Sequence, residues 1–224
     1  MSAFGAEQVA LAWSGGKDSA LALRALRELS VEVAALLTTI TEGYERVSMH
    51  GVRRALVRRQ AHAVGVPLVE VRIPPECSNR VYEQRLARAL SEPPLEHIGT
   101  VAFGDLFLAD VRAYREERLA SCGKRALFPL WGEETGALAK AFLAGGFGAF
   151  VVCLDPRRLD LGFAGRAYDE SFLFDLPPAV DPCGENGEFH TFVHKGPIFV
   201  SSVPCALGEI VERDGFVFCD VLTA

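Results

Sequence analysis

The sequence predicts an α/β fold, in which a parallel sheet carries helices on both faces and a smaller C-terminal mixed α+β domain follows. Two observations predict this class. Short apolar runs alternate with amphipathic segments of helical length, and several runs are continuously apolar, as parallel strands buried on both faces are. After about residue 125, glycine and proline become denser. We therefore predict one domain over residues 1–125 and a second over residues 126–224.

Each predicted element follows from the spacing of its apolar residues. The predicted strands cover residues 9–13, 31–38, 68–73, 98–103 and 149–154, and their alternation with helices assigns them to the parallel sheet. The predicted helices cover residues 17–29, 50–64, 78–90, 107–121 and 133–144. In the second domain, residues 189–193 should open a strand, and Asp214 and Gly215 should form the turn of a β-hairpin.

The motif Ser-Gly-Gly-Lys-Asp-Ser occupies residues 14–19, here called the glycine loop, between the first predicted strand and the first predicted helix. Gly15 and Gly16 let the backbone turn tightly and approach a ligand closely. The N–H groups that begin a helix point at a negative group, and Lys17 adds a positive charge. The loop therefore predicts a polyphosphate site, and the alternative is a plain turn between strand and helix.

The glycine loop differs from two common phosphate motifs, because its spacing is neither G-x-x-x-x-G-K-[ST] nor G-x-G-x-x-G. Ligands of parallel sheets bind beyond the carboxyl ends of the strands. We therefore expect the glycine loop, residues 38–41 and the pair Gly104 and Asp105 to meet at one edge of the sheet.

A second dense group of polar residues lies at residues 181–193, which read Asp-Pro-Cys-Gly-Glu-Asn-Gly-Glu-Phe-His-Thr-Phe-Val. Its glycines permit a backbone in which polar groups converge. Glu185 and Glu188 could hold Mg²⁺, act as bases or bind a substrate amine. The alternative is a polar loop that only leads into the following strand.

Composition narrows the function classes. The net charge is −6 and the isoelectric point about 5.4, which argues against a large nucleic-acid surface. No apolar run reaches the length of a membrane span. Residues 1–8 lack the pattern of a signal peptide, which predicts a cytoplasmic protein. The six cysteines include no C-x-x-C pair, so the sequence does not support a zinc or redox site.

Four segments in this order carry a family resemblance: the glycine loop, residues 104–118, Phe-Pro-Leu-Trp at 128–131 and residues 183–193. The glycine loop resembles the pyrophosphate loop of ATP pyrophosphatases, which cut ATP between its α and β phosphates. The other segments are more specific, and nearly the whole chain resembles the diphthine–ammonia ligase (diphthamide synthase) family.

The resemblance implies a Rossmann-like N-terminal domain that binds ATP with Mg²⁺, and a C-terminal domain that holds the acceptor. It implies activation of a carboxylate as an acyl-adenylate, release of pyrophosphate, and displacement of AMP by ammonia. The implied nucleotide-binding residues are Ser14, Gly15, Gly16, Lys17, Asp18, Ser19, Thr38, His50, Gly104 and Asp105. The implied catalytic residues are Lys17, Glu185, Asn186, Glu188 and His190. Asp18 is also the candidate Mg²⁺ ligand, and for His50 a helix-start histidine without a ligand is the alternative.

The implied acceptor is a small-molecule or protein-borne carboxylate. The protein itself is expected to be either a monomer or a homodimer. In diphthamide-making members of the family the second motif tends to read E-G-G-E-F-E-T, whereas here it reads Glu-Asn-Gly-Glu-Phe-His-Thr. His190 thus stands where those members have a carboxylate, as in the bacterial-type branch. A cationic acceptor such as diphthine would lose an attractive partner there.

Two other functions remain as alternatives. A sulfur-transfer or tRNA-modifying enzyme would need paired catalytic cysteines and a basic RNA surface, and the sequence shows neither clearly. A non-catalytic adenine-nucleotide sensor would need no dense group of acids, amide and imidazole such as residues 183–191.

Overall fold

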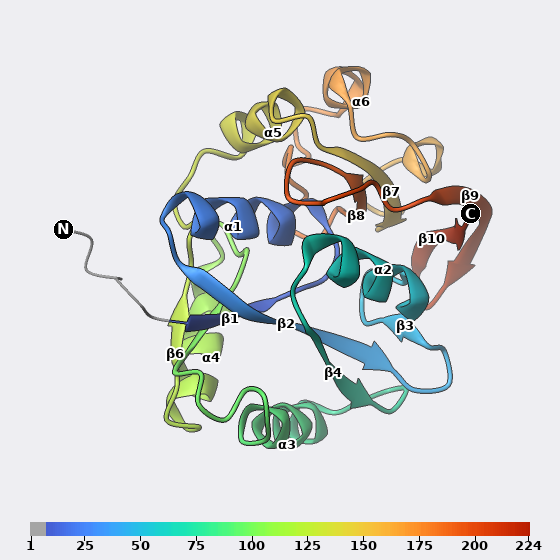
Figure 1. Ribbon diagram of the computed structural model, residues 1–224. Coiled ribbons are helices and arrows are strands. Elements are labelled where there is room, and N and C mark those ends of the chain that lie inside the picture. The colour runs from blue at the N-terminus through green and yellow to red at the C-terminus, as the bar shows by residue number, and fades with distance from the viewer. Residues whose placement is uncertain (1–7) are drawn as a thin grey trace.

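A computed structural model describes residues 8–224 (Figure 1). Residues 1–7, on which the predicted lack of a signal peptide mainly rests, lie outside the described part. Among the described residues, no helix has the length and apolar character needed to cross a membrane.

The first sheet is parallel except for one short strand. Strands β2 (Glu32–Thr41), β1 (Gln8–Ala12), β5 (Thr100–Ala102) and β6 (Arg125–Leu127) lie side by side in that order, and β4 (Leu68–Ile73) also pairs with β2. Strand β3 (Arg46–Val47) pairs antiparallel with the end of β2. The predicted α/β class is confirmed, although the short strands β3 and β6 lack enough residues to show a period.

Helices cover both faces of this sheet (Figure 1). Helices α1 (Lys17–Glu28) and α2 (Arg54–Val64) lie on one face, and α3 (Asn79–Leu90) and α4 (Ala109–Ala120) lie on the other. Successive side chains of a strand point to opposite faces of the sheet, so each strand contributes apolar residues to the core on both faces. Leu11 and Leu36 pack in the cluster that contains α1 and α2, whereas Ala10 and Ala35 pack in the cluster on the α3 and α4 side.

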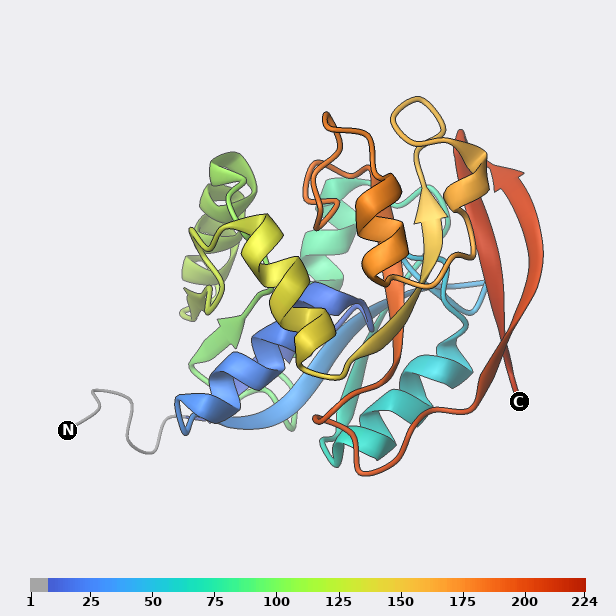
Figure 2. The same ribbon diagram turned by 90° about the horizontal axis from the view of Figure 1, so that it is seen from above.

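The second sheet is antiparallel and lies on the side of α1 and α2, as Figures 1 and 2 show. Its order is β8 (Phe189–Lys195), β7 (Gly148–Leu154), β10 (Phe216–Thr223) and β9 (Cys205–Arg213). Helices α5 (Thr135–Ala144) and α6 (Glu170–Asp175) and the 3₁₀-helix η1 (Leu161–Phe163) accompany it. The hairpin predicted about Asp214 and Gly215 is confirmed, since it joins β9 to β10.

Strand β7 corrects one prediction, because residues 149–154 do not join the parallel sheet. They pair antiparallel with β8 and β10. Residues 151–154 are all buried, so both faces of β7 are covered. A strand buried on both faces has the same continuous apolar pattern in either kind of sheet, and the pattern alone does not reveal its direction.

The start of α2 also differs from the prediction, because the helix begins at Arg54 rather than at residue 50. Met49 and Gly51 have φ angles of 66° and 69°, which lie in the left-handed region. Neither residue can therefore belong to a right-handed helix. This turn places the His50 side chain beside the glycine loop, as its contact with Gly16 shows.

Candidate functional site

The glycine loop packs tightly between the two sheets. It connects β1 to α1, with Gly16 at the N-cap and Gly15 at a φ of 80°. A Cβ atom on Gly16 would lie 3.0 Å from the carbonyl oxygen of Thr191 and 3.2 Å from Nε2 of His50. A side chain at position 16 would meet these atoms, so glycine is needed there for the loop backbone to approach both β8 and the turn before α2 this closely.

Two N–H groups of the loop already have partners. The Gly16 N–H donates to Oγ of Ser14 at 3.2 Å, and the Lys17 N–H donates to Oγ1 of Thr191 at 3.0 Å. The hydroxyl of Ser19 donates to the Gly16 carbonyl at 2.9 Å. A phosphate oxygen would have to replace the two hydroxyl acceptors, so these donors are not free as the sequence suggests.

Lys17 links the glycine loop to the second polar segment. Its side chain is 2% exposed, and Nζ donates to both carboxylate oxygens of Asp18, at 2.8 and 2.9 Å, and to the carbonyl oxygen of Cys183. Burial alone would lower the pKa of Lys17, but the Asp18 carboxylate holds it above its ordinary value. The lysine is therefore charged, and its charge lies at the contact between the two segments.

Residues 181–188, here called the acidic loop, are held together by their own side chains. Oδ1 of Asp181 accepts the N–H groups of Cys183 at 2.9 Å and Glu185 at 3.1 Å. Oε1 of Glu188 accepts the Asp181 N–H and Nδ2 of Asn186, both at 3.1 Å. Glu188 is 2% exposed, and its Oε2 atom has no hydrogen-bond partner among residues 8–224. Glu188 therefore stabilises the acidic loop through its Oε1 atom.

Glu185 joins the acidic loop to the carboxyl end of β5. Its Oε1 atom accepts the N–H of Leu106 at 2.7 Å. Burial raises the pKa of Glu185 to about 7, although the bond from Leu106 opposes the shift, and the negative charges of Asp18 and Asp105 add to it. A carboxyl group with this pKa changes its charge near neutral pH.

Two histidines stack against each other beside the glycine loop. The ring centroids of His50 and His190 are 4.4 Å apart, and the rings are inclined by 28°. Burial lowers the pKa of His190 to about 4 and that of His50 well below its ordinary value, where the proximity of His190 contributes. Both imidazoles are therefore neutral at neutral pH.

The remaining predicted residues lie at the same edge of the parallel sheet. A Cβ atom on Gly104 would lie 2.8 Å from the carbonyl carbon of Asp18, so the segment after β5 touches the start of α1. Asp105 accepts a hydrogen bond from Arg115 on α4 at 3.0 Å. Thr38 is buried in β2, and its Oγ1 atom has no hydrogen-bond partner in the described part of the chain.

Gln60 is a residue of this region that the sequence analysis missed. It is fully buried on α2; Nε2 donates to the carbonyls of Gly15 at 2.9 Å and Val193 at 2.6 Å, and Oε1 accepts from Nε1 of Trp13 at 3.1 Å. It joins the glycine loop to both sheets. A signal for it exists in the sequence, because Gln60 is a polar residue within the apolar stripe formed by Leu56, Val57 and their helical neighbours.

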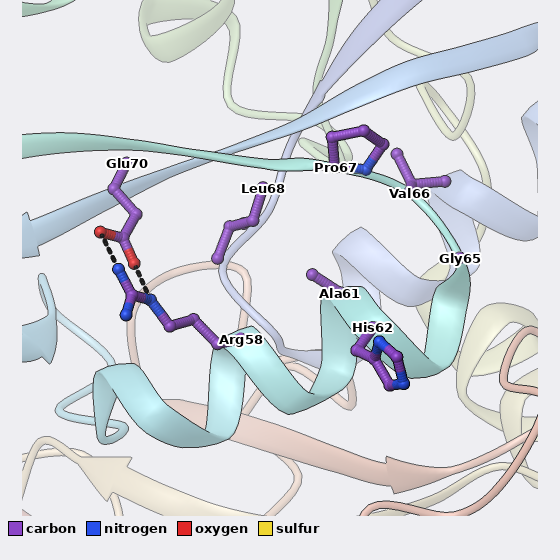
Figure 3. Close-up of a pocket in the computed structure, with 8 residues that line it drawn as sticks. All are labelled: Arg58, Ala61, His62, Gly65, Val66, Pro67, Leu68 and Glu70. Atoms are coloured by element: carbon purple, nitrogen blue, oxygen red, sulfur yellow. Dashed lines mark hydrogen bonds and ion pairs between the residues drawn. The ribbon is translucent and has the colours of Figure 1, made fainter.

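A hollow of about 650 Å³ lies elsewhere, between α2 and the start of β4 (Figure 3). Arg58 and Glu70 form an ion pair at its rim, and two arginines lower the pKa of Glu70 to about 2, against the effect of its burial. The hollow opens at the amino end of β4, whereas the candidate site gathers at the carboxyl ends of the strands. The two are separate features.

Comparison with known proteins assigns the chain to a family. Residues 7–125 match the model of the diphthamide synthase N-terminal domain, and residues 134–219 match that of the diphthamide synthase C-terminal domain. The diphthine–ammonia ligase of Schizosaccharomyces pombe (strain 972 / ATCC 24843) is 24% identical over 229 residues, an alignment that covers 92% of this chain and 37% of that protein. The chain thus spans well under half the length of this relative. Since the first model alone matches more than half of the chain and the second follows it in order, the chain belongs to the diphthamide synthase family.

Proposed function

We propose that this protein is an ATP-dependent ligase of the ATP-pyrophosphatase type. It adenylates a carboxylate with release of pyrophosphate, and ammonia then displaces AMP to give the amide. The observation that carries the proposal is the contact between the glycine loop and the acidic loop, made by Nζ of Lys17 on the Cys183 carbonyl. This contact brings a phosphate-type loop against a group of carboxylate, amide and imidazole side chains.

The residues of the glycine loop fit a polyphosphate. The N–H groups of Gly16 and Lys17 lie in the buried turn at the start of α1, where a phosphate oxygen could bind them by replacing the hydroxyls of Ser14 and Thr191. Lys17 supplies a charge for the leaving pyrophosphate, and donors that bind the transition state more tightly than the substrate accelerate cleavage. Thr38, His50, Gly104 and Asp105 complete the proposed nucleotide site.

Mg²⁺ would be held mainly by the phosphates of the nucleotide. Among residues 8–224, no three His, Cys, Asp or Glu side chains converge as metal ligands. Mg²⁺ in nucleotide sites commonly uses one or two carboxylates together with phosphate oxygens and water. Asp18, with a side chain 31% exposed, is the carboxylate nearest the loop charge and is the proposed protein ligand.

The acidic loop and the start of β8 form the proposed acceptor side, with Glu185, Asn186, Glu188 and His190 as its catalytic residues. The acceptor is a small-molecule or protein-borne carboxylate. Position 190 is a histidine, where the diphthamide-making pattern has a carboxylate. Because its lowered pKa keeps this histidine neutral, it adds no charge to the acceptor side. We therefore expect diphthine to be a poor acceptor. We also propose that the protein is cytoplasmic and that it acts as a monomer or a homodimer.

Product analysis tests the proposal. The protein is incubated with Mg·ATP, ammonium and a set of carboxylates that includes diphthine-bearing elongation factor 2. We expect AMP and pyrophosphate, formed only with an acceptor present. Formation of ADP and phosphate would overturn the proposed reaction type, and efficient amidation of diphthine would overturn the expected acceptor preference.

A further inference from the structure

The acidic loop carries more negative charge than its neighbours balance. Its carboxylates belong to Asp181, Glu185 and Glu188. The ammonium group of Lys17 reaches the loop through the Cys183 carbonyl, but it is already paired with Asp18. Buried carboxylates are costly unless cations or hydrogen-bond donors reach them. The loop is therefore suited to a small cation.

Two carboxylate oxygens of the loop are not used by the hydrogen bonds that hold it together. Oε2 of Glu188 is buried without a hydrogen-bond partner in the described part of the chain, while Oε1 is held by Asp181 and Asn186. Glu185 is half-buried and uses Oε1 for the Leu106 N–H, which leaves its second oxygen for a ligand. A buried carboxylate oxygen without a donor is rare in folded proteins and points to a missing partner.

The missing partner is a cation with N–H donors rather than a metal ion. A metal ion needs several ligands around one point, and among residues 8–224 no three acidic, histidine or cysteine side chains have that arrangement. An ammonium ion instead carries N–H groups that reach separate acceptors, as the ammonium group of a lysine does.

We propose that the acidic loop is the subsite for the ammonium substrate, with Glu185 as its principal anion and Glu188 as a second acceptor. This inference rests on the proposed function, which requires a nitrogen nucleophile close to the activated carboxylate. The subsite lies against the glycine loop, so a bound ammonium ion would wait beside the position where the acyl-adenylate forms.

Ammonium binding at this subsite depends on pH. The groups that face Glu185 are Lys17 and Asp18 on α1, Asp105 after β5, and Asp181 and Cys183 in its own loop. Burial raises the pKa of Glu185 to about 7. Below that pH the carboxyl group is neutral and attracts a cation less, so the affinity for ammonium should fall as the solution is acidified through pH 7.

Thermal unfolding of the intact protein tests the subsite without any acceptor. Ammonium chloride is compared with sodium, tetramethylammonium and magnesium chloride at constant ionic strength. A ligand that binds only the native state stabilises it by RT ln(1 + [L]/Kd), so Tm rises with the logarithm of the ligand concentration above Kd. We expect such a concentration-dependent rise with ammonium alone. Glu185→Gln should weaken the apparent ammonium affinity at least tenfold and abolish its pH dependence, and Glu188→Gln should weaken it by a smaller factor.

Glu209→Gln is the matched control, because Glu209 is an exposed carboxylate on β9, at the far edge of the second sheet. It should respond to ammonium as the wild type does. The subsite is overturned if the wild type shows no rise specific to ammonium, if Glu185→Gln keeps the full response, or if magnesium alone produces the rise.

Failure of the subsite and failure of the proposed function give different results. A protein that forms AMP and pyrophosphate but shows no response specific to ammonium keeps its proposed reaction and loses the subsite. A protein that binds ammonium through Glu185 but forms ADP keeps the subsite and loses the proposed reaction.

Discussion

Lys17 joins the glycine loop to the acidic loop through a single charged group. Lys17→Ala should lower the rate of pyrophosphate release by the equivalent of roughly 2–4 kcal/mol, comparable with the loss of an oxyanion-type donor. Nucleotide affinity should fall less, because the backbone donors of the loop remain. Single-turnover kinetics and nucleotide titration measure the two effects. Lys140→Ala, an exposed lysine on α5, is the control, and a wild-type rate in Lys17→Ala would show that the loop is only structural.

The two half-buried histidines and Glu185 give opposite contributions to stability at acid pH. His190 has a pKa of about 4 in the folded protein, so acidification from pH 7 to 5 protonates the unfolded chain first and favours unfolding. Glu185 has a pKa of about 7, so it takes its proton first in the folded protein and opposes that loss. The Tm of His190→Gln should therefore fall less on acidification, and that of Glu185→Gln should fall more.

The matched control for this pair is His97→Gln, because the side chain of His97 is 90% exposed. Its Tm should follow that of the wild type between pH 7 and pH 5. If His190→Gln and His97→Gln show the same acid dependence, then His190 is not held neutral by burial.

At the scale of elements, Gly104 sets how closely the segment after β5 approaches α1. A Cβ atom there would lie 2.8 Å from the carbonyl carbon of Asp18 and 3.1 Å from the Ser19 nitrogen, and backbone atoms cannot give way as a flexible side chain can. Gly104→Ala should cost roughly 1–3 kcal/mol of unfolding free energy and weaken nucleotide binding. Gly99→Ala has no atom within 4 Å of its Cβ position and should be nearly neutral. Equal denaturant midpoints for the two variants would contradict this packing.

The contact of α2 with the glycine loop depends on Gln60. Gln60→Ala would leave the Gly15 and Val193 carbonyls and the Trp13 indole without their partner, and would open a cavity beside them. We expect a loss of roughly 2–4 kcal/mol in unfolding free energy, together with weaker nucleotide binding. Urea unfolding measures the first effect. Gln84→Ala, an exposed glutamine on α3, should change neither.

At the scale of the molecule, the two sheets share one hydrophobic core. Residues of β1, α1 and α2 pack in the same buried cluster as residues of β7, β8 and β10. Hydrogen bonds also cross between the two parts, such as the Val193 N–H to the Gly15 carbonyl at 2.9 Å and the Val200 N–H to the Ala63 carbonyl at 2.8 Å. The predicted boundary between residues 125 and 126 therefore separates segments of the sequence that pack closely together.

A fragment that ends at residue 133 tests how far the first part is independent. It would expose the apolar face of α1 and α2 to water and lose the bonds to β8. We expect the fragment to lack the cooperative thermal transition of the full chain, measured by circular dichroism. A sharp transition in the fragment would show that residues 1–133 fold without the second part of the chain.

Most of the first sheet could be predicted from the sequence because its signals are local. The helical period of residues 17–29 and the alternation of apolar and charged residues over 69–73 require no knowledge of distant residues, and α1 and β4 match the predicted elements within one residue. Strand β6, with three residues, is too short for a period. The direction of β7 depends on which strands pair with it, and pairing is a property of the whole fold.

The sequence by itself determined the α/β class, the position of the glycine loop and the chemistry of residues 181–193, because turn residues, periodicity and side-chain types act locally. Only the tertiary structure decided which residues from distant parts of the sequence contact one another. It pairs Lys17 with the Cys183 carbonyl across 166 residues, stacks His50 on His190, and buries Gln60 between Gly15 and Val193. The physical reason is that burial and hydrogen-bond pairing are set by the packing of the second sheet on α1 and α2, and no local pattern encodes which distant groups that packing brings together.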